Sequence, residues 1–178
     1  MVRAFLAYEL SDDIRSGLSK AQDLLRGCSA RLTFVAPAQI HVTIKFLGEV
    51  EDRKLPALIE ALKGTEFTPF AAKAGRVTVN SPRRPFTVWS GIDDGGNGAL
   101  LRDRVEDILA PLGFPRETRP FTAHATVARV KRYDPSLMTA LQNLGTRTYG
   151  ECTVAAMNLK KSTLTSAGPV YEDLLVVP

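Results

Sequence analysis

The stretches His41–Phe46 (HVTIKF) and His124–Arg129 (HATVAR) hold the only two histidines of this 178-residue chain, each with a threonine two positions later. β-Branched and apolar residues fill the positions between them, which is typical of a half-buried strand. Alternate residues of a strand point to the same face, so the histidine and threonine of each stretch share a face. A polar pair repeated in this way predicts one functional motif present twice.

The strand period also assigns the neighbours of the first motif. Lys45 is expected on the face of His41 and Thr43, where its amine would be placed to bind an anionic ligand. Phe46 has the opposite parity and is expected to pack in the core.

In the second motif, Ala128 rather than Arg129 shares the parity of His124 and Thr126. Arg129 therefore joins their face only if the strand contains a twist or a bulge, or ends there. An arginine on that face would suit phosphate binding, and a structural ion pair is the competing interpretation.

Helices and antiparallel strands are mixed along the rest of the chain. Helices are expected from Asp12 to near Gly27 and at residues 52–62, 99–112 and 136–144, with strands at 2–10, 32–35, 41–47, 75–80, 86–92, 124–130, 151–156 and 158–164. The two histidines lie 83 residues apart, and each half holds a helix and a His-x-Thr strand. These features predict an α+β fold in which residues 1–178 form a single domain of two similar lobes, with antiparallel sheets flanked by helices, a pseudo-twofold duplication and a central cleft.

Composition sets the broad class: 44% hydrophobic and 24% charged residues indicate a globular protein, and a net charge of +4 allows an anionic partner such as RNA. Cys28 and Cys152 stand far apart, without the spacing of a zinc site or a disulfide framework. No signal peptide pattern and no run of about 20 apolar residues is found, so we expect a cytoplasmic protein that does not bind a membrane.

The sequence lacks the motifs of several common kinds of functional site. Two histidines supply only two of the four ligands that zinc usually takes, and neither motif has a carboxylate or cysteine at ligand spacing. The chain also contains no G-x-S-x-G elbow, P-loop or G-x-G-x-x-G. Two imidazoles with ordinary pKa values of about 6.5 do suit displacement at a phosphodiester, one as base and one as acid, with threonine hydroxyls on the phosphate oxygens.

Nearly the whole chain resembles the two-histidine phosphoesterases, and within them the RNA 2',3'-cyclic phosphodiesterases, also called 2'-5' RNA ligases. The matching segments are RAFLAYEL, IHVTIKFLGEV, SPRRP, VWSGI, LGF, RPFTAHATVARV and KKSTLTSAGPVYE. Ala123 departs from the proline that many members have before the second histidine.

The resemblance implies a bilobal α+β fold and an enzyme that opens a terminal 2',3'-cyclic phosphate of RNA to a 2'-phosphate. It implies His41 as the proton donor and His124 as the proton acceptor, with Thr43 and Thr126 beside them, and neither a metal nor another cofactor. Weak, reversible, ATP-independent 2'-5' ligation is implied too. The partners are RNA ends with a cyclic phosphate, tRNA halves among the candidates, and we expect a monomer.

Two other readings of the motifs stay open: a phosphodiesterase acting on a small cyclic nucleotide, and a non-catalytic RNA- or nucleotide-binding module. Trp89 is expected to be a half-buried strand residue, and Arg83 and Arg84 to form a solvated loop that could approach RNA. Ser162 and Tyr171 are expected beside the substrate.

Overall fold

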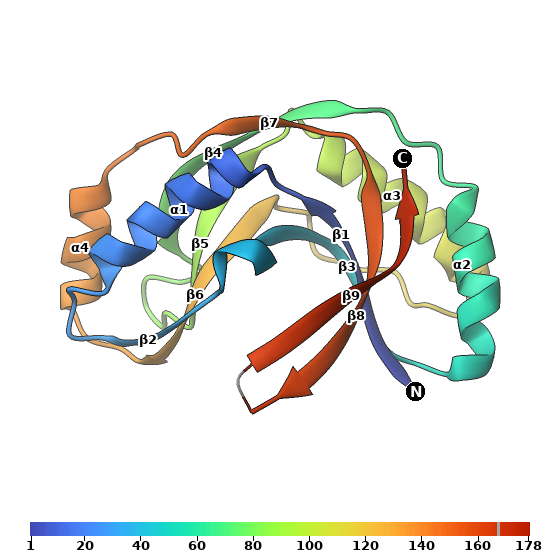
Figure 1. The fold of residues 1–178 in the computed structure, drawn as a ribbon, viewed down its shortest axis with the longest axis horizontal. Helices are drawn as coiled ribbons and strands as arrows, with labels where there is room; N and C mark the ends of the chain where they lie inside the picture. The colour runs from blue at the N-terminus through green and yellow to red at the C-terminus, as the bar shows by residue number, and fades with distance from the viewer. Residues whose placement is uncertain (167) are drawn as a thin grey trace.

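One antiparallel sheet carries the fold, with helices packed at both of its ends (Figure 1). The computed structural model describes residues 1–166 and 168–178, so Ala167 of the closing segment lies outside the described residues. The α-helices are α1 (Asp12–Leu25), α2 (Leu55–Lys63), α3 (Asn97–Leu109) and α4 (Ser136–Leu144). The strands are β1 (Val2–Glu9), β2 (Arg31–Phe34), β3 (His41–Val50), β4 (Phe70–Val79), β5 (Thr87–Asp93), β6 (His124–Arg132), β7 (Glu151–Val154), β8 (Met157–Thr165) and β9 (Gly168–Val177).

The strand order is β7-β4-β5-β6-β3-β1-β8-β9, and β2 pairs with β6. Helices α1 and α4 contact each other and the β7, β4, β6 part of the sheet, whereas α2 and α3 lie together beside β3 and β9. Each lobe thus takes one helix from each half of the sequence. The α+β prediction is confirmed, and the two lobe sheets are continuous through the pairing of β3 with β6.

Helix α1 follows its sequence signals. The Ser11 hydroxyl accepts a hydrogen bond from the Ile14 amide at 3.3 Å, and Asp12 and Asp13 occupy the first turn, where negative charge suits the helix dipole. Ile14 and Leu18 are fully buried. These apolar residues therefore lie on the face that α1 packs against the sheet.

The segment DDGGNG before α3 is organised around a buried carboxylate. Asp94 accepts a hydrogen bond from the Tyr8 hydroxyl at 2.9 Å and from the Gly98 amide at 3.1 Å. A Cβ atom at Gly98 would lie 2.4 Å from that carboxylate, so the close approach requires glycine. Asp94 thereby fixes the start of α3 against β1.

The C-terminal strand β9 was not expected from the sequence. It pairs with β8 along its whole length, from Met157 opposite Val177 to Thr165 opposite Gly168. Pro169 and the consecutive acidic residues Glu172 and Asp173 break the alternation by which a strand is recognised. Helix 99–112 ends earlier than predicted, because α3 passes into a 3-10 turn at Ala110–Leu112.

Among the described residues, no helix is both long enough and apolar enough to cross a lipid bilayer.

Candidate active site

The junction of β3 and β6 gathers both motifs on one face of the sheet. The residue after each histidine pairs with its counterpart in the antiparallel neighbour. Continuing this register by one residue places His41 opposite Thr126 and Thr43 opposite His124. Side chains directly opposite have Cβ atoms about 4.5–5.5 Å apart, and the diagonal between the two histidines is about 7–8 Å. One phosphate group can therefore touch all four side chains.

Both imidazoles are held in the same way. Nδ1 of His41 lies 2.7 Å from the Gln39 carbonyl, and Nδ1 of His124 lies 2.7 Å from the Thr122 carbonyl. A carbonyl only accepts, so Nδ1 carries the hydrogen in each ring and Nε2 is the free nitrogen of the neutral form. No described residue hydrogen-bonds either Nε2, so both atoms are available to a substrate.

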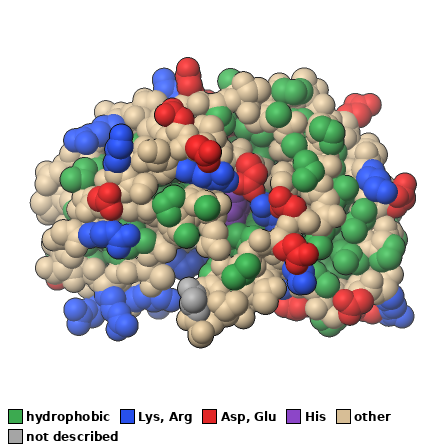
Figure 2. Space-filling model, viewed as in Figure 1, with side chains coloured by type: hydrophobic (Ala, Val, Ile, Leu, Met, Phe, Trp, Pro, Cys, Tyr) green, Lys and Arg blue, Asp and Glu red, His purple; other side chains and the backbone are tan. Residues whose placement is uncertain are grey.

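Aromatic rings enclose His41 more fully than His124. Phe5 stacks on His41 with 5.1 Å between ring centroids, and Tyr171 meets its edge at 5.4 Å. Trp89, half-buried as predicted, lies 4.2 Å from the ring of His124. A histidine is visible near the middle of the face in Figure 2, between acidic and basic side chains.

The surroundings of His41 shift its pKa. Burial lowers the pKa of His41 below its ordinary value, and the nearby positive charges of Lys160 and Arg15 lower it further. The hydrogen bond to Gln39 and the charge of Glu9 act against burial but are outweighed. The free protein therefore favours a neutral imidazole at His41 near neutral pH.

The expected position of Lys45 is wrong. Leu6 pairs with Lys45 and Ala7 with Thr43, so Ile44 is an extra residue in β3 and forms a bulge. Lys45 is consequently turned to the helix side, where it is 3% exposed. Its amine donates to both carboxylate oxygens of Glu106, at 2.8 and 2.9 Å, and to the Pro115 carbonyl at 2.7 Å. Lys45 is a buried structural residue, which leaves it no means of holding RNA.

The same bulge overturns the core assignment of Phe46. Its side chain is 66% exposed, and its ring lies 6.1 Å from that of Phe5, which in turn stacks on His41. Phe46 thus lies on the face of the histidines. Lys45 and Phe46 have exchanged the faces that strict alternation assigns to them.

A matching bulge in β6 brings Arg129 to the site. Val88 pairs with Ala128 and Trp89 with Thr126, which leaves Val127 as the extra residue. Arg129 is exposed and makes no ion pair with any described residue. Burial raises the pKa of the Tyr171 hydroxyl, and the charge of Arg129 opposes that rise. The bulge that the sequence left as one condition for Arg129 to join the motif is present.

A network of charged residues that the sequence analysis did not identify lies beside His41. Glu9, the strand partner of His41, forms ion pairs with Arg15 and with Lys160, the latter at 2.6 Å. Lys160 also lies 2.7 Å from Asp173. Burial alone would lower the pKa of Lys160, but these carboxylates raise it above its ordinary value. Lys160 therefore stays charged at neutral pH.

Hydrogen bonds also hold the residues that lead into β3. The Arg15 guanidinium donates to the Ile40 carbonyl at 3.3 Å, and the Gln39 side chain donates to the Pro169 carbonyl at 2.7 Å. These residues are far apart in the sequence and form no spaced motif, so no sequence signal marks them. Ser162 pairs with Tyr171 in the β8–β9 hairpin, and of the two Tyr171 contacts His41.

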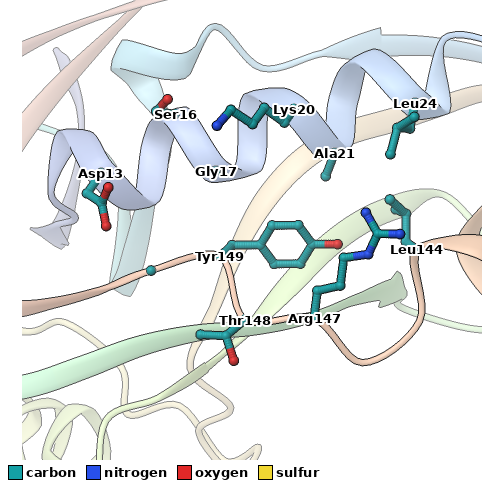
Figure 3. A pocket seen from close by; sticks show the side chains of 11 residues that line it. Asp13, Ser16, Gly17, Lys20, Ala21, Leu24, Leu144, Arg147, Thr148 and Tyr149 are labelled. Atoms are coloured by element: carbon teal, nitrogen blue, oxygen red, sulfur yellow. The ribbon is translucent and has the colours of Figure 1, made fainter.

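A separate cavity of about 310 Å³ lies between α1 and the segment 144–150 (Figure 3). Ala21, Arg147 and Tyr149 are among its lining residues, and neither histidine is. The Tyr149 hydroxyl has no hydrogen-bond partner among the described residues.

The described part of the chain contains no cluster of three or more side chains able to ligate a metal.

The chain matches the model of a known protein family. The model of the LigT-like phosphoesterases aligns with residues 9–89 and again with residues 95–171. The two matches divide the chain between them, with one His-x-Thr motif in each, as a duplication predicts.

Curated relatives cover almost the full length. The RNA 2',3'-cyclic phosphodiesterase of Archaeoglobus fulgidus is 36% identical over 98% of this chain and 99% of its own. The enzyme of the same name from Methanothermobacter thermautotrophicus is 33% identical over 98% and 97%.

Solved structures share the fold. A crystal structure of a Thermus thermophilus protein superposes with a TM-score of 0.80 at 28% identity, covering 98% of this chain and 96% of that one. Escherichia coli LigT complexed with 3'-AMP gives a TM-score of 0.78 at 22% identity over 98% and 96%, a likeness of fold alone.

Proposed function

Because this chain belongs to the LigT-like phosphoesterase family, we propose that it is an RNA 2',3'-cyclic phosphodiesterase that hydrolyses a terminal cyclic phosphate to a 2'-phosphate. The single observation that carries the proposal is the pairing of the two His-x-Thr strands, which leaves two free Nε2 atoms on one face. The names of the full-length relatives supply the substrate. The 3'-AMP bound to E. coli LigT is a related ligand.

The proposed reaction moves two protons. Nε2 of His124 accepts a proton from water as the water oxygen bonds to phosphorus. The bond from phosphorus to the 3' oxygen breaks, and Nε2 of protonated His41 donates a proton to that oxygen. The hydroxyls of Thr43 and Thr126 donate hydrogen bonds to the non-bridging oxygens, where negative charge develops. Arg129 adds a positive charge beside the phosphate.

The lowered pKa of His41 makes substrate binding part of this mechanism. A proton donor must be protonated, whereas the free protein favours the neutral ring. A bound cyclic phosphate brings a negative charge next to the imidazole, and an opposite charge favours the protonated form. His41 therefore takes up a proton together with the substrate.

A dependence on pH follows from the direction of this shift. The donor loses activity as pH rises through its pKa, so kcat/KM, which reports the free enzyme, should decline on the alkaline side from below 6.5. The alkaline limb of kcat, which reports the complex, should lie at higher pH. Steady-state kinetics from pH 5 to 9 test this, and coincident alkaline limbs would contradict proton uptake at His41.

Ligation would use the same groups. If a 5'-hydroxyl replaces water as nucleophile, the product is a 2'-5' linkage and no ATP is consumed. We expect ligation to be weak and reversible, because water is abundant and ring opening relieves strain. We also propose that tRNA halves are among the substrates and that the protein acts as a cytoplasmic monomer, a single domain of two lobes.

Phosphorus NMR tests the proposed hydrolysis directly. A short RNA ending in a 2',3'-cyclic phosphate is incubated with the protein in excess EDTA, and 2'-phosphate is the expected product. A 3'-phosphate product would reverse the assignment of the leaving oxygen. Rapid hydrolysis of a cyclic mononucleotide with no turnover of RNA would instead favour the small-nucleotide reading.

A further inference from the structure

We propose that the RNA chain leading to the cyclic phosphate is bound along the C-terminal half of β6, on a set of exposed basic residues that we call the basic track. The inference rests on the proposed function and deepens it. The track consists of Arg31, Arg83, Arg84, Lys131 and Arg132, and it begins next to Arg129.

Strand pairing gathers these residues from three parts of the sequence. On one side of β6, β2 places Arg31 opposite Arg132. On the other side, the Val130 amide donates to the Phe86 carbonyl at 3.0 Å, which brings the loop 81–86 with Arg83 and Arg84 alongside. The pairing of β2 with β6 skips Lys131, which forms a second irregularity in the strand and is exposed beside Arg132.

The side chains of the track are free to bind an anion. All five are exposed, and none forms an ion pair with a described residue. Figure 2 shows Lys and Arg side chains gathered at one edge of the molecule, the edge at which β2 lies in Figure 1. The charge of Arg132 acts on Asp134, whose pKa is lowered first by its hydrogen bonds with Ser136 and also by that charge.

The two motif strands, β3 and β6, carry different charges beyond their His-x-Thr motifs. A shift of 83 residues relates Arg129, Lys131 and Arg132 on β6 to Phe46, Gly48 and Glu49 on β3. Both strands carry a His-x-Thr motif followed by a bulge, but only β6 continues with positive charge. A polyanion held at the histidines is therefore drawn toward β6, because attraction to unpaired basic groups dominates binding of nucleic acid backbones.

The track reaches beyond a single nucleotide. Strand residues advance about 3.3 Å each and Val127 is an extra residue in the bulge, so Lys131 lies roughly 13 Å along β6 from Thr126. Each nucleotide added to the end that carries the cyclic phosphate brings another phosphate toward the track, so a long single strand meets more of its basic residues than a dinucleotide does. The track thus predicts that substrate affinity depends on RNA length and on salt.

The test compares KM for two single-stranded substrates with terminal cyclic phosphates, a dinucleotide and a 12-mer. The variant is the triple substitution Arg31→Gln, Lys131→Gln and Arg132→Gln. We expect the ratio of the 12-mer KM to the dinucleotide KM to rise at least tenfold. The slope of log affinity against log salt for the 12-mer should fall by about 2, since each phosphate contact on a single strand contributes about 0.7.

A matched control removes the same charge elsewhere: Arg26→Gln, Arg53→Gln and Lys63→Gln, three exposed residues already paired with acidic neighbours. An equal change in the KM ratio in both triple variants would overturn the track. Fluorescence anisotropy of a 12-mer ending in a 2'-phosphate tests the track without turnover. If neither substrate is hydrolysed, the proposed function fails, while weaker 12-mer binding by the track variant alone would still support the track.

Discussion

Substitution of His124 by alanine is expected to lower kcat/KM on a cyclic-phosphate RNA at least about 10²-fold, because each proton transfer contributes roughly 10² to 10⁴ in rate. His41→Gln should cost a similar factor. Glutamine keeps most of the volume that the His41 ring fills between Phe5 and Tyr171, whereas alanine would leave a void there. Single-turnover kinetics measure the loss, and thermal melting should show little change for His124→Ala.

A threonine variant and a double histidine variant provide comparisons for the single histidine substitutions. Thr43→Val removes one hydrogen bond to a phosphate oxygen and should cost less than either histidine. The loss in the His41→Gln, His124→Ala double variant should fall short of the product of the single losses, because the two groups act as a unit. Turnover that persists at the wild-type rate without either imidazole would refute acid–base catalysis by this pair.

The sequence predicts the site better where strand alternation holds. His41, Thr43, His124 and Thr126 precede the bulges, so period-2 reasoning places them on one face, as the structure does. Lys45 and Phe46 follow a bulge, and their faces are reversed. A bulge is a property of pairing between strands, so the letters of one strand do not reveal it.

The repeat of the His-x-Thr motif indicates the position of Arg129 better than strand alternation does. Arg129 could join the second motif only if the strand broke its period, and β3 and β6 do so at matching positions. The network of Glu9, Lys160 and Asp173 had no comparable signal, because β1, β8 and β9 meet only in the folded sheet. Strand β9 was missed because its pattern is irregular, although β8 pairs with all of it.

The buried pair of Lys45 and Glu106 gives the largest expected effect on stability. Both residues are 3% exposed, and the Glu106 carboxylate also accepts a hydrogen bond from the Glu117 amide at 3.1 Å. Lys45→Ala would leave Glu106 as an uncompensated charge in the core, which typically costs about 3–5 kcal/mol of unfolding free energy. Urea denaturation followed by circular dichroism measures the change.

The double variant Lys45→Met, Glu106→Gln separates the cost of an orphaned charge from the loss of the pair. Methionine fills the space of the lysine stem and glutamine can still accept from Glu117, so the double variant should be more stable than Lys45→Ala. The exposed pair of Lys63 and Glu60 is the control, because Lys63→Ala should change stability by less than about 1 kcal/mol. If Lys45→Ala proves as mild as Lys63→Ala, the amine is not the partner that keeps Glu106 charged in the core.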